Sequence, residues 1–184
     1  MLKSRTITLA GRDDGLKLRL TELPAMLADA RARAVLKRLG EDPDGGVAAL
    51  AFKHSREALK LGVDTLLPFV QGAIGAHELD LRRDIKDWRN VERLQNAALL
   101  LHVDFMLGRE TLEIPVTFQA QSILAGSGSA RATFCSPQIA AVLESGKGTY
   151  RELETVLSTE DVFNLVEIIN VAALREWHAH QATQ

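Results

Sequence analysis

The sequence predicts a mainly α-helical protein of the α+β class, with a long central helix and a small β component at the N-terminus. Apolar residues recur at helical spacing over most of the chain, whereas strict alternation is confined to the first stretch. Hydrophobic residues make up 46% of the sequence but aromatic residues only 5%, a composition that suits closely packed helices. At 184 residues we expect a single domain over residues 1–184.

The N-terminal residues 4–21 have the pattern of a β-hairpin. Residues 6–9 alternate between polar and apolar, residues 11–15 are turn formers, and residues 16–20 alternate again. A two-stranded hairpin is only marginally stable, so helices or another strand must cover its apolar face.

Residues 24–107 are predicted to form a helical body. Its first helix begins at Pro24 and stops before Gly40. The apolar positions of this helix are Leu23, Leu27, Ala30, Ala34, Val35, Leu36 and Leu39. Two shorter helices and one long helix are expected to follow, with Pro68 kinking the second short one. Their predicted ranges are 47–61, 63–74 and 80–107.

The long helix is expected to be the spine of the fold. Asp80 is a good N-cap and Gly108 a natural stop. Its apolar residues recur every roughly 3.4 positions, near the 3.5 repeat of helices that pack along a partner. These residues are Leu81, Ile85, Trp88, Val91, Leu94, Ala98, Leu101 and Phe105.

The last third of the chain is predicted to contain a short extended segment and then helices. Residues 112–135 favour two short strands, with Pro115 at an edge or a bend. Helices are expected over residues 136–181. Three pairs of residues mark where these helices begin: Ser136 with Pro137, and the capping boxes Thr149 with Glu152 and Ser158 with Asp161.

Charge and composition argue against several classes of function. The formal net charge is −2, so the protein as a whole is not attracted electrostatically to nucleic acid or to an anionic membrane. The single cysteine, Cys135, cannot form an internal disulfide, and the N-terminus has no signal-peptide pattern. No apolar run reaches the ~18 residues of a membrane span. We therefore expect a cytoplasmic protein that does not span a membrane.

Cys135 is the basis of one alternative, a small cysteine-dependent enzyme. It precedes a predicted helix N-terminus, where the helix dipole lowers a thiol pKa. A nucleophile also needs a positioned base, and the sequence marks no histidine for that role. The histidines are His54, His77, His102, His178 and His180. A buried structural cysteine is the preferred interpretation, so we expect no catalytic residue.

No metal or cofactor site is expected either. His178 and His180 are two positions apart, a spacing that points their rings away from each other on a helix. The Gly126–Ser129 stretch lacks both the phosphate-loop ending and the dinucleotide fingerprint, so it is interpreted as a connector.

A basic stripe on the predicted long helix is the basis of a second alternative, a nucleic-acid-binding adaptor. Its members follow helical spacing and flank Trp88. They are Arg82, Lys86, Arg89 and Arg93. Because Asp84, Asp87 and Glu92 interleave with them, a solvated face or an acidic protein partner is preferred.

Both ends of the chain resemble one family. The hairpin leading into Leu18-Arg19-Leu20-Thr21-Glu22-Leu23-Pro24 resembles the opening of tail assembly chaperones of long-tailed bacteriophages. The closing segment from Tyr150 through Ser158-Thr159-Glu160-Asp161 into an apolar helix is similar to that family's ending. The resemblance implies a non-catalytic cytoplasmic protein, encoded by a phage or prophage, that shields the tape-measure protein and helps recruit tail-tube subunits.

We therefore expect a protein partner, a tape-measure or tail-tube protein, gripped by apolar helical surfaces, together with a tendency to form homo-oligomers. Aromatic side chains dominate the energetics of such interfaces. The candidate anchors are Trp88, Phe105, Phe163 and Trp177.

Overall fold

The structure, a computed structural model, describes residues 2–61, 69–110, 112–116, 118 and 132–182. Helices account for 61% of it and are joined by one small antiparallel sheet, which confirms the predicted fold class. The strands are β1 (Ser4–Thr8), β2 (Lys17–Thr21), β3 (Gly72–Ile74) and β4 (His77–Glu78). The α-helices are α1 (Ala25–Leu39), α2 (Gly46–Phe52), α3 (Ser55–Lys60), α5 (Leu81–Asp84), α6 (Trp88–Val103), α8 (Pro137–Glu144), α9 (Tyr150–Thr155) and α10 (Thr159–Gln181). Short 3₁₀ turns are η1 (Gly11–Asp13), η2 (Pro43–Gly45) and η3 (Asp104–Leu107).

The sheet begins with the predicted hairpin. β1 pairs with β2 from Ser4 opposite Thr21 to Thr8 opposite Lys17. Along β2, Leu18 and Leu20 are buried while their neighbours are not, because side chains alternate between the two faces of a strand.

A second hairpin, β3 and β4, extends this sheet in the order β1-β2-β3-β4. The prediction of a helix over residues 63–74 is therefore wrong at Gly72–Ile74, and residues 63–68, including Pro68, lie outside the described residues. β3 pairs antiparallel with the edge of β2 that does not face β1, with Arg19 opposite Ala73 and Leu20 opposite Gly72. Glycine is required there, since a Cβ on Gly72 would lie 2.3 Å from the Arg19 carbonyl oxygen.

The expected helix over residues 80–107 is divided in three: α5, α6 and η3. The first break falls at residues 85–87, where the Asp13 carboxylate accepts the backbone N–H groups of Lys86 at 2.9 Å and Asp87 at 3.0 Å. These donors are thereby diverted from helical bonding. Asp87 then caps α6 by accepting the Arg89 N–H. The predicted helix over 47–61 is likewise divided, into α2 and α3.

Three clusters of buried side chains follow one another along the molecule. α6 contributes to the first two of them and α1 to the last two. The sheet core includes Ile7, Leu9, Leu18, Leu20, Leu81, Ile85, Val91, Leu94, Ala98 and Leu101. The central core includes Leu23, Ala28, Ala32, Val35, Leu36, Val47, Leu50, Phe69, Leu99 and Val103. The C-terminal core includes Ala25, Met26, Cys135, Ile139, Val142, Leu153 and Val162.

The buried face of α1 differs only in part from the predicted one, since Leu23, Val35 and Leu36 are buried as expected. Leu27, Ala30 and Ala34 are exposed, whereas Asp29 and Arg33 are buried. These two side chains are satisfied inside the protein: Asp29 accepts the Ser136 N–H at 2.9 Å, and Arg33 pairs with Asp44 at 2.7 Å. Burial of these hydrogen-bonded polar groups brings a different face of the helix inward.

The two short strands expected within residues 112–135 are absent from the described residues of that range, which are 112–116, 118 and 132–135. The remainder of the range, including Gly126–Ser129, lies outside the described residues. Further along the chain, α8 begins with Ser136 as N-cap and Pro137 as its first residue, as predicted.

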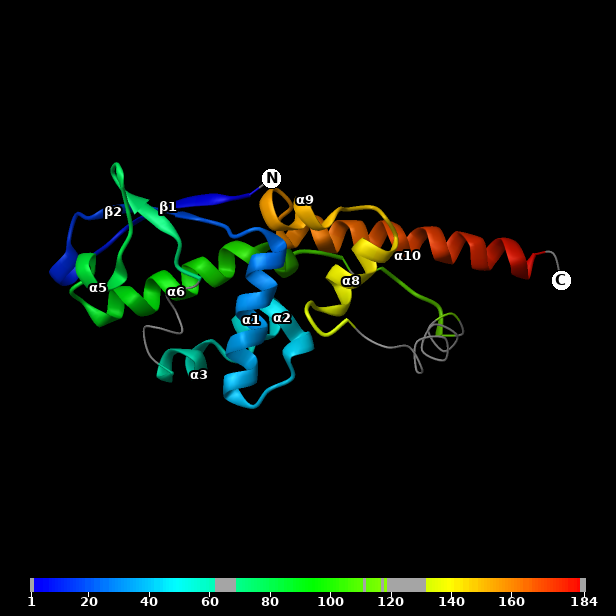
Figure 1. Ribbon diagram of the computed structural model, residues 1–184, viewed down its shortest axis with the longest axis horizontal. Helices are drawn as coiled ribbons and strands as arrows, with labels where there is room; N and C mark the ends of the chain where they lie inside the picture. The colour runs from blue at the N-terminus through cyan, green and yellow to red at the C-terminus, as the bar shows by residue number, and fades with distance from the viewer. Residues whose placement is uncertain (1, 62–68, 111, 117, 119–131, 183–184) are drawn as a thin grey trace.

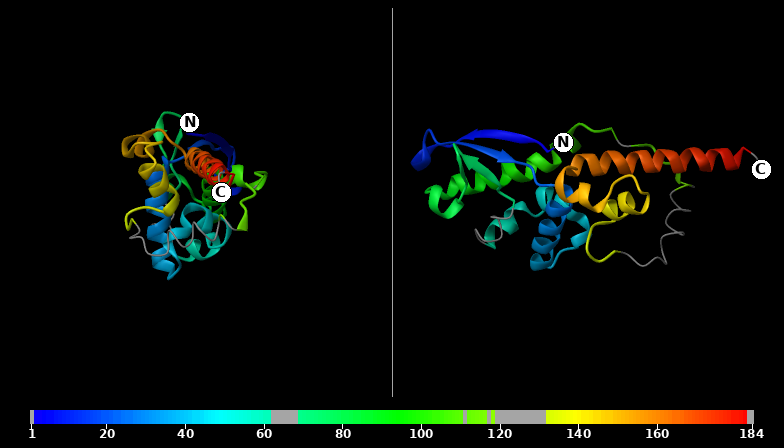
Figure 2. Two further views of the ribbon diagram at one scale, coloured as in Figure 1. Left: turned by 90° about the vertical axis from the view of Figure 1, so that its right-hand side faces the viewer. Right: turned by 45° about the horizontal axis from the view of Figure 1, so that its top comes forward.

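The molecule is elongated. The sheet and α6 occupy one end, α1 and α2 the middle, and α10 extends from the middle to the other end (Figure 1). In a second orientation, α10 runs well past α8 and α9 before the C-terminus (Figure 2).

Candidate protein-interaction site

α10 begins at a fixed point in the C-terminal core. The Ser158 hydroxyl accepts the Asp161 N–H at 3.1 Å, and the Asp161 carboxylate accepts the Ser158 N–H at 2.9 Å. This is the predicted capping box. Thr159 and Val162 are buried against the core. The direction in which α10 leaves the core is therefore set by its first turn.

Beyond Val162, α10 has no fully buried residue, although its sequence stays apolar. Ile168 is 52% exposed. The other apolar side chains of this part are half-buried or exposed: Phe163, Leu165, Val166, Ile169, Val171, Ala172, Ala173, Leu174 and Trp177. We call residues 163–177 the α10 outer segment. Leu165, Val166 and Ile169 still pack against the C-terminal core. The apolar surface that this segment offers to another chain is therefore on its remaining face, where Ile168 is exposed.

Arg109 attaches the segment after η3 to the α10 outer segment. Its guanidinium donates to Asn164 Oδ1 at 2.7 Å and forms an ion pair with Glu167. Two hollows of about 350 and 470 Å³ lie at this pair. The first is lined partly by Leu112, Ile114, Phe163 and Val166, and the second partly by Ile168, Val171 and Ala172. Arg109, Asn164, Glu167 and Arg175 form the rest of the second hollow, so its apolar wall is bordered by polar groups. Hollows with an apolar wall suit the side chains of a docked helix.

The predicted aromatic anchors do not form one surface. Phe105 and Phe163 pack together, with ring centroids 5.6 Å apart, and the Arg109 guanidinium lies 5.8 Å from the Phe105 centroid. Trp177 packs against Phe118 at 6.0 Å. Trp88, by contrast, is 50% exposed at the start of α6, at the opposite end of the molecule from the end of α10 (Figure 1).

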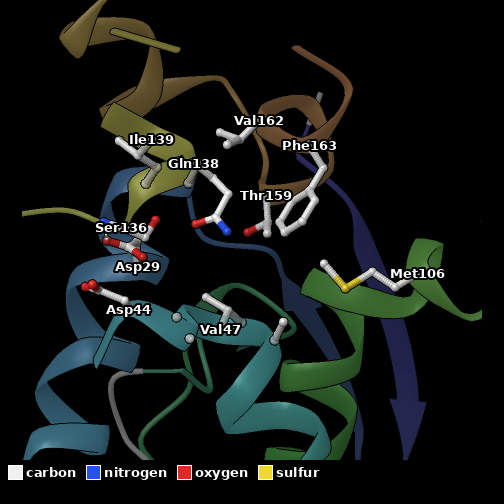
Figure 3. Close-up of a pocket in the computed structure, with 14 residues that line it drawn as sticks. Asp29, Asp44, Val47, Met106, Ser136, Gln138, Ile139, Thr159, Val162 and Phe163 are labelled. Carbon is white, nitrogen blue, oxygen red and sulfur yellow. Dashed lines mark hydrogen bonds between the residues drawn. The ribbon is translucent and has the colours of Figure 1, made fainter. Parts of the chain in front are cut away.

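A cavity of about 320 Å³ lies between α1, α2, α8 and the start of α10. Figure 3 shows Gln138 and Thr159 pointing toward each other across it, with Val47 and Met106 on the opposite side. Met106 and Phe163 line both this cavity and the first hollow on α10, so the two spaces adjoin. Burial raises the pKa of Asp29 at the cavity wall, although hydrogen bonds from Ser136 oppose the shift.

Cys135 lies directly before the N-cap of α8 and is buried, as the preferred interpretation expects, whereas the enzyme alternative requires an activated thiol. The thiol is 1% exposed, and burial together with the nearby charge of Asp29 raises its pKa. The lowered pKa expected from the helix terminus is therefore wrong. The other charged groups that act on this pKa are Arg33 and Glu144, and no described histidine is among them.

The predicted basic stripe is divided by the break after α5. Arg82 lies on α5, Lys86 in the connection, and only Arg89 and Arg93 on α6. Arg89 is paired with Asp87 at 3.3 Å. Arg89 and Arg93 instead line an open hollow beside β1 together with Arg5 and Glu92.

The described histidines are engaged in separate local contacts. His102 is fully buried: its Nε2 accepts the Leu23 N–H at 3.1 Å, and its Nδ1 lies 2.7 Å from the Ala98 carbonyl oxygen. This arrangement fixes a neutral ring with the proton on Nδ1. Within the described part of the chain, no group of three or more His, Cys, Asp and Glu side chains is placed to hold a metal ion.

Several residues of the site were not singled out from the sequence. Arg109 and Met106 lie in a segment whose pattern carries no motif, and their roles depend on contacts with α10, more than 50 residues away. Asp29 was missed for the same reason: its burial depends on Ser136, which is more than 100 residues away in sequence.

Comparison with known proteins finds no matching family model, no matching curated protein and no matching solved structure. Among the described residues, the structure contains no helix with both the length and the apolar character needed to cross a membrane.

Proposed function

We propose that this chain is a non-catalytic adaptor that binds a helical segment of another protein along the α10 outer segment. One observation carries the proposal: α10 stays apolar for several turns after its last fully buried residue, Val162. Exposed apolar side chains on a helix lower the solubility of a protein. Their presence on α10 therefore favours a partner that covers them.

The chemistry of the surface supports a helical partner. Apolar side chains of a docked helix recur every three to four residues, and the two hollows, both lined in part by Arg109 and Glu167, each offer an apolar wall. Charged groups at the margin of such a groove favour one register of the partner over others.

The particular role that we propose is that of a phage tail assembly chaperone. The hairpin-to-helix opening and the capped, apolar C-terminal helix are the features that resemble that family, and the second of these is the proposed surface itself. In this role the partner is a tape-measure or tail-tube protein, the site of action is the host cytoplasm, and the chain self-associates while its partner is absent.

The test is capture of partners from cells during phage or prophage expression, with wild-type protein and the Ile168→Asp variant compared by mass spectrometry. We expect the wild type to recover a tape-measure or tail-tube protein. A charge at an exposed anchor position should lower recovery about tenfold, the effect of roughly 1.4 kcal/mol.

The matched control is Val156→Asp. Val156 lies at the end of α9 and is 54% exposed, against 52% for Ile168, so both variants place the same charge at an equally open apolar position. The control should bind like the wild type, and both variants should keep the wild-type melting temperature. Equal recovery with Ile168→Asp, or no tail protein in any capture, contradicts the proposal.

A further inference from the structure

We propose that the cavity between α1, α2, α8 and α10 is a binding site for an alkyl-ammonium group. The ammonium lies at the polar wall that Asp29, Gln138 and Thr159 form, and the apolar stem lies against Met106 and Phe163. The cavity adjoins the first hollow on α10 and shares Met106 and Phe163 with it. Its polar wall lies outside that hollow, and the inference does not depend on the proposed function.

The first supporting observation is an unsatisfied hydroxyl. Thr159 is 8% exposed, and its Oγ1 has no hydrogen-bond partner among the described residues. Its side chain points into the cavity toward Gln138 (Figure 3). A buried hydroxyl without a partner is costly, so a ligand that supplies a donor is favoured here.

The second observation is the charge of the lining. Two carboxylates, Asp29 and Asp44, line the cavity, and its lining includes no Lys, Arg or His. Arg33, outside the lining, pairs with Asp44 at 2.7 Å. Asp29 accepts hydrogen bonds from Ser136, and the charge of Arg33 also lowers its pKa, against the larger effect of burial. A single guanidinium therefore faces two carboxylates. One negative charge is thus left to be balanced, which favours a cation and disfavours an anion.

The third observation is the apolar remainder of the cavity. Its volume of about 320 Å³ is at the lower end of ligand sites. Most of its other lining side chains are apolar: Ala25, Val47, Ala48, Met106, Ile139, Val162 and Phe163. An ammonium on a short alkyl stem matches this division into a polar wall and an apolar wall. A free alkyl amine and a lysine side chain of another protein share that chemistry.

The test uses the purified full chain and n-hexylamine as the probe, followed by NMR at the amides of Ala48 and Val162. n-Hexanol and hexanoate are the matched probes, since they have the same stem with a neutral or a negative head. We expect saturable shifts with hexylamine, at least about tenfold weaker binding of hexanol, and no binding of hexanoate.

Variants then assign the binding to the cavity. Thr159→Val removes the hydroxyl at nearly constant volume and should weaken hexylamine binding about tenfold without loss of stability. Thr159→Ser keeps the hydroxyl and should bind like the wild type. Ala48→Leu fills the space and should abolish binding. If a captured protein partner is displaced by hexylamine, the natural ligand is a lysine side chain; if it is not displaced, the ligand is a free amine.

Two results would overturn the inference. Equal binding of hexylamine, hexanol and hexanoate means that the cavity is only an apolar void. Absence of any shift at Ala48 and Val162 with hexylamine means that water alone satisfies Thr159. Either result leaves the proposed function of the α10 outer segment untouched, because the probe experiment uses the protein without a partner.

Discussion

Asp13 joins the hairpin to the helical part of the fold. Although burial alone would raise its pKa, hydrogen bonds from Asn90 and from the backbone of Lys86 and Asp87 lower it. One carboxylate thereby positions η1 of the N-terminal hairpin against the start of α6. Its ionised form is the one that these donors stabilise.

We predict that Asp13→Ala destabilises the protein by at least about 2 kcal/mol, because three donors lose a charged acceptor. Urea denaturation at neutral pH measures the change. Asp14→Ala is the control, since the neighbouring Asp14 is exposed, and it should stay within about 0.5 kcal/mol of the wild type. Equal effects of the two variants contradict this role of Asp13.

His102 makes stability depend on pH. Burial lowers its pKa from the usual 6.5 to about 4, since the neutral ring is the form that its hydrogen bonds and surroundings accept. The folded protein therefore binds fewer protons than the unfolded chain between these values. Its contribution is fully present above about pH 6.5 and is lost as the pH falls toward 4.

We predict that the free energy of unfolding falls by roughly 2 kcal/mol between pH 6.5 and pH 5 through this one group. Urea denaturation of wild type and His102→Gln at both pH values isolates it, because carboxylates contribute equally to both proteins. The variant should lose less stability over this interval than the wild type. Parallel losses would show that His102 is not the group responsible.

At the scale of elements, the beginning of α10 determines where the proposed surface points. Ser158 is 2% exposed and takes part in both hydrogen bonds of the capping box. The capping box fixes the first turn of α10, and the packing of Leu165, Val166 and Ile169 on the C-terminal core continues the direction set there.

We predict that Ser158→Ala costs about 1 kcal/mol of stability, the usual effect of removing an N-cap hydroxyl, and weakens partner capture. Ser158→Thr keeps an oxygen acceptor and should restore most of both properties. Thermal denaturation and the capture assay provide the two readouts. A Thr variant as impaired as the Ala variant would show that packing at Ser158, rather than capping, matters.

Elements defined by local signals were predictable from sequence. The β1–β2 hairpin, the Ser136–Pro137 start of α8 and both capping boxes depend on residues within a few positions of each other. These features could be predicted because turn residues, alternation and cap spacing act over short distances.

Features that depend on distant residues could not be predicted. α6 is separated from α5 because Asp13, more than 70 residues away, takes its backbone donors. The break explains why Trp88 is exposed although it continues the apolar spacing of the predicted helix. The α1 face was misassigned because Asp29 and Arg33 find partners that local pattern does not reveal.

At the scale of the whole molecule, three cores arranged in a row produce an elongated shape. The sheet core and the central core share α6, and the central and C-terminal cores share α1. α10 continues the long axis beyond the last of these cores (Figure 2). The α10 outer segment, which contains no fully buried residue, carries the proposed surface along this axis.

The most direct test of the central claim is hydrogen exchange of the α10 backbone, with and without the captured partner. Alone, amides of the α10 outer segment should exchange faster than the hydrogen-bonded amides at the buried positions of α6, because α6 is far more deeply buried. With the partner bound, residues 163–177 should become the most strongly protected part of the chain. Protection that leaves α10 unchanged, or that maps to the sheet end of the molecule instead, would contradict the account.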